Sequence, residues 1–129
     1  MTHYVGILDG HDDVWGVRVP DLPGVHGGGA TAEAAIADAI SAAREWAASV
    51  AAKGTPIPNP RPLAEVLAEV EADEAPVMIP LLLDKGRTVK ANVTFDAGLL
   101  EAIDAEAKQR GLTRAAFLAS AARDKIIAG

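Results

Sequence analysis

The sequence predicts an α+β protein of two units: a small antiparallel sheet with a covering helix over residues 1–84, and a strand followed by two helices over residues 85–129. Short apolar runs bounded by turn formers predict the sheet, and one long stretch with apolar residues at helical spacing predicts the covering helix. The charge changes sign at the boundary. Residues 1–84 contain thirteen Asp/Glu and four Lys/Arg, and residues 85–129 contain five Asp/Glu and eight Lys/Arg, so that −9 and +3 give the net charge of −6. Such asymmetry is typical of an acidic body with a nucleic-acid-binding tail.

Two strands joined by a turn open the chain. Residues 4–9 and 14–19 are apolar and β-rich, and the segment between them, 9–13, is rich in Asp and Gly. This pattern predicts a hairpin. The prolines and glycine of 20–24 end the second strand, and residues 25–30 predict a short, glycine-rich third strand.

A long helix follows. Thr31 is a suitable N-cap, and Lys53 with Gly54 supplies a cationic last turn and a stop. The apolar stripe expected to face the sheet consists of Ile36, Ile40, Ala43, Ala47 and Val50.

The rest of the first unit is a connector, a short helix and a strand. Four prolines within 55–62 exclude helix and central strand there. Periodicity predicts a short helix over 63–70, and the apolar run 77–83 has the length of a strand. Pro80 predicts that this strand lies at an edge of the sheet, since proline cannot donate to a central ladder.

The second unit begins with a strictly alternating segment, 88–95. Asp96 and Thr113 are placed to cap two helices, and Gly111 to end the first of them. A single strand with two helices leaves an unpaired edge and buries too little surface to be stable alone. We therefore predict a homodimer in which the two strands pair antiparallel, with the apolar side chains of the strand facing the helices. Those side chains are Val89, Ala91, Val93 and Phe95.

The opposite face of this ribbon has the chemistry of base recognition. It carries Lys90, Asn92 and Thr94, and a two-stranded ribbon fits the major groove of DNA. Asn bonds adenine bidentately, Lys donates to guanine, and Thr serves either base. The alternative interpretation is an ordinary solvated strand face, but its position in the basic third of the chain favours DNA.

Phosphate contacts are expected from four further residues. Thr113 and Arg114 stand at the start of the last helix, where free N–H groups and the helix dipole suit an anion. Lys85 and Arg87 add charge that does not depend on DNA sequence.

The tail resembles the ribbon-helix-helix family of bacterial regulators. The resemblance rests on Val-Lys-Ala-Asn-Val-Thr-Phe-Asp at 89–96, Leu-Leu-Glu-Ala-Ile-Asp at 99–104 and Arg-Gly-Leu-Thr-Arg-Ala-Ala-Phe-Leu at 110–118. It places base reading on the same strand residues and the phosphate clamp on Thr113 and Arg114. One departure is Asp96-Ala97, where many relatives have Pro-Glu.

The first unit resembles the HicB antitoxin family over residues of about 3 to 62. The likeness is carried by Val-Trp-Gly-Val-Arg-Val-Pro-Asp-Leu-Pro-Gly-Val at 14–25, Gly-Gly-Ala-Thr-Ala-Glu-Ala-Ala-Ile-Ala-Asp-Ala at 28–39 and Gly-Thr-Pro-Ile-Pro-Asn-Pro at 54–60. Gly27-Gly28-Gly29 departs from relatives, which carry more polar residues there.

This resemblance implies a partial RNase H-like domain without catalysis. It would bind and neutralise a small basic HicA-like toxin that cleaves mRNA, while the tail represses the operon by binding operator DNA. The −9 charge of the first unit suits a basic partner independently. Toxin contacts are expected at Trp15, Asp21 and Trp46, although the two tryptophans could equally be core anchors. Whether the dimer pairs again into a tetramer stays open.

Other classes of function are disfavoured. The chain has no cysteine, which removes disulfides and thiolate metal sites, and it has no run of apolar residues long enough to span a membrane. With no signal peptide at its start, we expect a cytoplasmic protein without a cofactor. The glycines at 27–29 lack the sequel of a phosphate loop and fit a tight strand end.

Two alternatives to the antitoxin remain. One is a ribbon-helix-helix repressor whose first unit senses a ligand or only oligomerises. The other is a metal-dependent nuclease, which would need carboxylates converging from several elements. Its candidate ligands are Asp9, Asp12, Asp13, Asp21, His3, His11 and His26. Because Asp12 and Asp13 lie in the expected turn, we predict no catalysis and no metal.

Overall fold

A computed structural model describes residues 1–83 and 87–128. The chain divides into two compact units, Met1–Lys85 and Gly86–Gly129. The predicted α+β class is confirmed. The elements are β1 (Thr2–His11), β2 (Val14–Arg18), β3 (His26–Gly29), α1 (Ala32–Ala52), α2 (Leu63–Leu67), β4 (Ala75–Leu81), α3 (Ala97–Gln109) and α4 (Arg114–Ala128).

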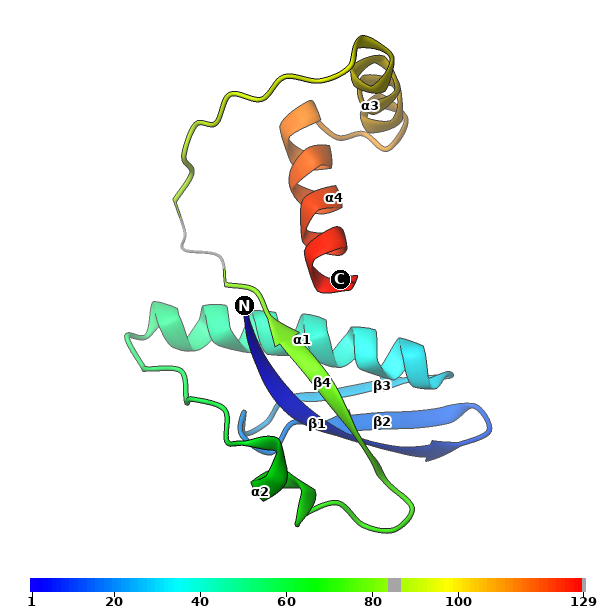
Figure 1. Cartoon of the computed structure of the whole chain (residues 1–129), viewed down its shortest axis with the longest axis vertical. Coiled ribbons are helices and arrows are strands. Elements are labelled where there is room, and N and C mark those ends of the chain that lie inside the picture. The colour runs from blue at the N-terminus through cyan, green and yellow to red at the C-terminus, as the bar shows by residue number, and fades with distance from the viewer. Residues whose placement is uncertain (84–86, 129) are drawn as a thin grey trace. The chain divides into compact units, whose positions relative to one another are not determined.

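The first unit contains a four-stranded antiparallel sheet in the order β3-β2-β1-β4 (Figure 1). β1 pairs with β2 from Ile7–Arg18 to His11–Val14, which confirms the predicted hairpin. β1 also pairs with β4 from Thr2–Leu81 to Leu8–Ala75. β4 therefore lies at an edge, as Pro80 predicts.

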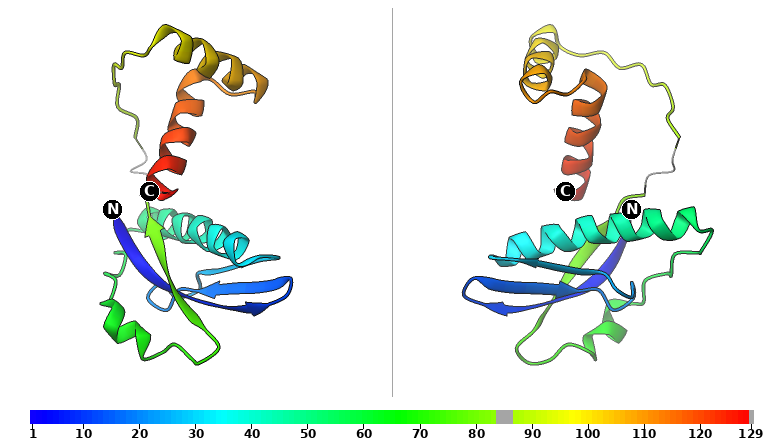
Figure 2. Two further views of the ribbon diagram at one scale, coloured as in Figure 1. Left: turned by 45° about the vertical axis from the view of Figure 1, so that its right-hand side comes forward. Right: turned by 180° about the vertical axis from the view of Figure 1, so that it is seen from behind.

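The two helices of this unit lie on opposite faces of the sheet. The long α1 covers one face and the short α2 lies against the other (Figure 2). Because side chains alternate along a strand, Val5 and Ile7 of β1 pack with Val66 of α2, whereas Tyr4 belongs to the core beneath α1. α2 is shorter than the predicted helix over 63–70 and ends at Leu67.

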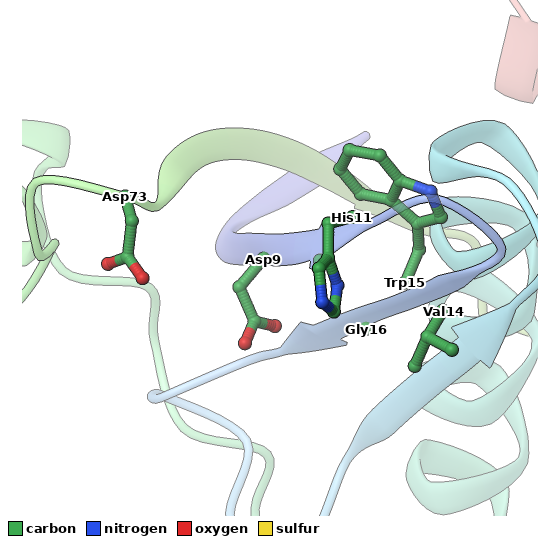
Figure 3. Close-up of a pocket in the computed structure, with 7 residues that line it drawn as sticks. Asp9, His11, Val14, Trp15, Gly16 and Asp73 are labelled. Atoms are coloured by element: carbon green, nitrogen blue, oxygen red, sulfur yellow. The ribbon is translucent and has the colours of Figure 1, made fainter.

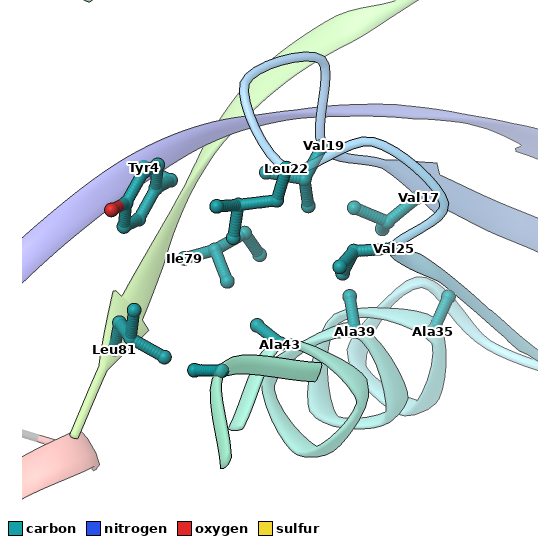
Figure 4. Packing of buried hydrophobic residues seen from close by; sticks show 11 residues of the cluster. Tyr4, Val17, Val19, Leu22, Val25, Ala35, Ala39, Ala43, Ile79 and Leu81 are labelled. Carbon is teal, nitrogen blue, oxygen red and sulfur yellow. The ribbon is translucent and has the colours of Figure 1, made fainter. Parts of the chain in front are cut away.

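The core beneath α1 corrects the predicted apolar stripe. Ile36 and Ile40 are only half-buried, at the margin of the contact. The fully buried residues of α1 are four alanines at intervals of four: Ala35, Ala39, Ala43 and Ala47. Figure 4 shows the first three pointing at the sheet. Ala43 and Ala47 were predicted correctly, and Val50 is half-buried. In the first half of the helix the prediction chose Ile36 and Ile40, each one residue too late, because it followed the largest apolar side chains. The residues nearest the sheet are small since the helix lies close to it there.

Two glycines of β3 permit this close approach. A Cβ atom on Gly27 would lie 2.3 Å from the amide nitrogen of Ala39 and 2.4 Å from the carbonyl oxygen of Ala35. A Cβ on Gly29 would lie 2.9 Å from the amide nitrogen of Ala35. Between them, the amide of Gly28 donates to the Asp38 carboxylate at 2.9 Å. The triple glycine is thus a packing feature that fastens the edge strand to α1.

The helices of the second unit begin and end as predicted. The Asp96 carboxylate accepts from the amide of Leu99 at 3.1 Å, and the Thr113 hydroxyl accepts from the amide of Ala116 at 3.1 Å. Gly111 adopts a φ of +69°, which ends α3 in a conformation that favours glycine.

The predicted strand over 88–95 is absent from the single chain. Residues 87–95 form a stretch without regular structure that leads into α3 (Figure 1). The reason is that a strand requires a hydrogen-bonded neighbour, and this segment has none among the residues that the structure describes. Its pairing with a second copy therefore stays a prediction.

We expect Gly27→Ala to destabilise the first unit strongly, because its methyl group would collide with the backbone of α1. Overpacking of this kind costs about 1–3 kcal/mol or more in the free energy of unfolding. Gly28→Ala is the matched control, since its nearest neighbour would be the carbonyl oxygen of Trp15 at an ordinary 3.7 Å. Urea unfolding measures both variants. Equal stability of the two would contradict the close packing.

Candidate functional site

A groove lies at the turn end of the β1–β2 hairpin (Figure 3). Strand alternation puts Asp9 and His11 of β1 on the same face as Ile7, and Val14 and Gly16 pair opposite them. This is the face opposite α1, and α2 covers only its other end, around Val66. The groove has a volume of about 630 Å³, and we call it the hairpin groove. It is lined by Asp9, Gly10, His11, Val14, Trp15, Gly16 and Asp73.

The hairpin groove is acidic and partly apolar. Asp9 and Asp73 are exposed on opposite sides of it, and no cation among residues 1–83 and 87–128 forms an ion pair with either (Figure 3). Asp12 and Asp13 follow in the turn. Val14 is 64% exposed although it is a large apolar residue. A surface of this kind suits a partner that carries both positive charge and apolar side chains.

The two tryptophans that were predicted as anchors both flank the core beneath α1. Trp15 is half-buried, and its indole Nε1 donates to the carbonyl oxygen of Asp12 at 3.0 Å, which fixes the ring beside the turn. Trp46 is half-buried on α1. Trp15 borders the hairpin groove, but its indole lies on the α1 side of the hairpin, away from Asp9 and His11 (Figure 3). A contact of either tryptophan with a partner stays a prediction.

The third predicted contact, Asp21, has a role inside the domain. Its carboxylate accepts from the amide of Arg61 at 2.8 Å and from the guanidinium Nε of Arg61 at 2.6 Å. The side chain is only 8% exposed. This pairing ties the loop between β2 and β3 to the proline connector. The Tyr4 hydroxyl fastens the same connector by donating to the carbonyl oxygen of Pro58. Its pKa is raised by burial and by the charge of Asp21.

A second ion pair lies near the groove. Arg18 of β2 donates through both terminal nitrogens to the carboxylate of Glu74. The pKa of Glu74 is lowered by this hydrogen bond and by a further one from the amide of Glu71. Arg18 is thereby committed to Glu74 and leaves the charge of Asp9 without an ion pair.

No metal-dependent active site is evident in the part of the chain that the structure describes. There, no three His, Asp or Glu side chains gather closely enough to hold a metal ion. Asp21 is held by Arg61, and Asp12 lies in the turn with a φ of +52°. Within the same residues, no helix is long and apolar enough to cross a membrane.

The predicted DNA-contacting residues of the tail are accessible. Arg87, Lys90, Asn92 and Thr94 are all exposed. Thr113 is exposed too, and its hydroxyl caps α4. Lys85, another predicted contact, lies outside the described residues. Of the apolar side chains of the same segment, Val89 is 79% and Val93 is 67% exposed, whereas Phe95 is half-buried.

Arg114, predicted as a phosphate clamp, is engaged in the single chain. Its Nε and Nη2 donate to the two carboxylate oxygens of Asp104 on α3, each at 2.8 Å. The pKa of Asp104 is lowered by this hydrogen bond. Beside the pair lies a groove of about 360 Å³, which brings Arg114 and Asn92 to one surface with several apolar residues. The apolar members are Ala91, Val93, Phe95, Leu100, Ala115 and Leu118.

Comparison with known families decides the affiliation of the chain. Residues 4–122 match the model of the HicB-like antitoxins of bacterial toxin-antitoxin systems. The chain belongs to this family. The prediction made from the sequence motifs is thus confirmed, and because HicB antitoxins are not enzymes, so is the prediction of a non-enzymatic protein. No curated protein sequence matches the chain.

Solved structures agree with the family assignment. The HicB antitoxin of Burkholderia pseudomallei is 29% identical, over 95% of this chain and 96% of that one, with a TM-score of 0.60. The antitoxin HicB3 is 25% identical, over 98% of both chains, with a TM-score of 0.56. A chain of the HicA3–HicB3 toxin-antitoxin complex shares the fold, at 17% identity over 64% of this chain and 99% of that one, with a TM-score of 0.51.

We expect Glu74→Gln to change how stability depends on pH. A carboxyl whose pKa is lowered on folding stabilises the fold above its unfolded pKa, near 4.5, and loses this contribution as pH falls through the folded pKa. The variant should therefore be less stable than wild type at pH 7, and the two should converge on acidification below about 4.5. Thermal melts from pH 7 to pH 3 measure this, with Glu71→Gln as control. Parallel curves would contradict the assigned role of the pair.

Proposed function

We propose that this HicB-family protein is an antitoxin with two binding activities. Its first unit binds and neutralises a small, basic, HicA-like toxin that cleaves mRNA, and its tail binds operator DNA as a dimer to repress the operon. The observation that carries the proposal is the match to HicB-like antitoxins over residues 4–122, which spans most of both units. The opposite charges of residues 1–84 and 85–129, −9 and +3, suit a basic protein and DNA respectively.

The hairpin groove is the surface of the first unit that best fits the toxin. It combines carboxylates that form no described ion pair, at Asp9 and Asp73, with the exposed apolar side chain of Val14. A related antitoxin, HicB3, occurs in a complex with the toxin HicA3. We extend that type of partner, and no particular contact, to this chain.

A second copy would complete the core of the tail. Among its described residues only Ile103 and Ala107 are buried apolar side chains, and α4 buries none. The exposed apolar residues of the tail are Val89, Val93, Leu99, Leu112 and Ile126. This is too little buried area for an independent domain, and pairing two 88–95 segments would cover the strand residues and satisfy their backbone groups.

The same pairing would create the DNA-reading surface. If Val89, Val93 and Phe95 turn toward the helices, strand alternation turns Lys90, Asn92 and Thr94 outward from both copies. A ribbon with these side chains fits the major groove, and Arg87 with the start of α4 lies in reach of the backbone. The proposed DNA-reading surface therefore exists only in the dimer.

For the toxin, we expect Asp9→Asn combined with Asp73→Asn to weaken binding about three- to tenfold, because two exposed charge pairs are removed. The probe is the small basic protein that co-purifies with the tagged chain from its native host, measured by calorimetry and by rescue of growth. The control is Glu33→Gln with Glu45→Gln, which removes the same charge from α1 on the other side of the sheet. Equal losses would contradict the hairpin groove. If no basic protein is recovered, the chain is a plain repressor.

For DNA, we expect Asn92→Ala to lose about 1–3 kcal/mol of operator binding and to relax sequence preference. Arg87→Ala should weaken all sequences alike and lower the salt slope by about 1. Titrations compare the DNA upstream of the gene with a scrambled duplex. Unchanged selectivity in Asn92→Ala would contradict the reading face, and a folded monomer in sedimentation of the wild type would contradict the ribbon.

A further inference from the structure

The ion pair between Arg114 and Asp104 links the two helices of the tail. Arg114 is the first residue of α4, and Asp104 lies in the second half of α3. Two parallel hydrogen bonds of 2.8 Å join Nε and Nη2 of the guanidinium to Oδ1 and Oδ2 of the carboxylate. Such a two-pronged geometry is also the one with which arginine binds a phosphate group.

Asp104 thus occupies the edge of Arg114 that a DNA phosphate would use. The start of α4 already favours an anion, because the helix dipole is positive there. Asp104 supplies an anion from within the chain, and it is charged at neutral pH since Arg114 holds its pKa below the ordinary value. The two side chains are 55% and 45% exposed, so water screens the pair and a phosphate can displace the carboxylate.

We propose that Asp104 is an internal competitor of the DNA backbone for Arg114, and that it sets an upper limit on the DNA affinity of the tail. This inference rests on the DNA-binding function proposed above. On binding, Arg114 exchanges the Asp104 carboxylate for a phosphate, so the cation contributes less than an unpaired arginine would.

The salt dependence of binding distinguishes this role from general charge repulsion. A cation that neutralises a phosphate releases about 0.9 counterion from duplex DNA. Arg114 is already neutralised by Asp104, so it adds little to this release. Without the carboxylate, each copy gains one free cation, and the slope of log K against log salt should steepen by about 0.9 per protomer.

The chain provides a matched control on the same helix. Glu106 also pairs with an arginine, accepting from Arg110 Nε at 2.7 Å, and it is 42% exposed, close to the 45% of Asp104. Glu106→Gln and Asp104→Asn therefore remove the same charge from α3 and break one exposed ion pair each. Only the second change frees Arg114.

The experiment measures binding of the full-length variants to the DNA upstream of the gene and to a random duplex of about 30 base pairs, across a series of salt concentrations. We expect Asp104→Asn to bind both duplexes about three- to tenfold more tightly at about 0.1 M salt, with the steeper slope, and Glu106→Gln to change affinity less than about twofold. In an Arg114→Ala background, Asp104→Asn should have no such effect. Asp104→Ala, which favours helix, serves as a second variant if Asn perturbs folding.

Three results would overturn the inference. Weaker binding by both Asp104 variants would show that the carboxylate positions Arg114 for DNA. Equal effects of Asp104→Asn and Glu106→Gln, or an effect that persists in Arg114→Ala, would show general electrostatics. A wild type that binds neither duplex would overturn the proposed DNA function itself, which separates that failure from the other two.

Discussion

The first unit depends on the close approach of α1 to the glycine strand β3. Alanines on the helix and glycines on the strand leave no room for a Cβ at Gly27, where the backbone of Ala39 would lie 2.3 Å away. Small residues give little apolar area each, but they let the long helix lie flat on the sheet. The larger side chains of the sheet, such as Val17 and Ile79, then fill the space beside the alanine stripe (Figure 4). The glycines at 27 and 29 are therefore explained by packing.

Because α1 covers one face of the sheet, the opposite face is the one available to a partner. The short α2 and Val66 close only one end of it, over Val5 and Ile7. Toward the hairpin turn the same face carries Asp9 and His11, which are polar and exposed. An exposed apolar sheet face is costly in a domain of this size unless polar residues or a partner cover it. Here polar residues lie on the face, and a partner can bind to it. The architecture thus leaves the hairpin end of this face accessible, and this is where we propose that the toxin binds.

Most of the fold could be predicted from the sequence because its signals are local. Turn residues set the hairpin, Thr31, Asp96 and Thr113 cap their helices, and Pro80 assigns β4 to an edge. The errors arose where tertiary contact overrides pattern. Periodicity selected Ile36 and Ile40 for the centre of the helix contact, although the closest approach demands alanine. The segment 88–95 alternates as a strand does, yet it forms no strand in the single chain, where it has no hydrogen-bonded neighbour among the described residues.

The predicted functional residues also divide into those that the local pattern identifies and those whose role depends on tertiary contacts. Residue type and alternation were enough to nominate Lys90, Asn92 and Thr94, whose exposure in the single chain is consistent with that interpretation. Nothing in the local sequence could show that Asp21 is held by Arg61, 40 residues away, or that Arg114 is held by Asp104 on the preceding helix. Both are ion pairs between a carboxylate and an arginine that form only in the folded chain. They decide which of the candidate charges are committed and which are free, and binding by an acidic or a basic surface depends on that balance more than on net charge.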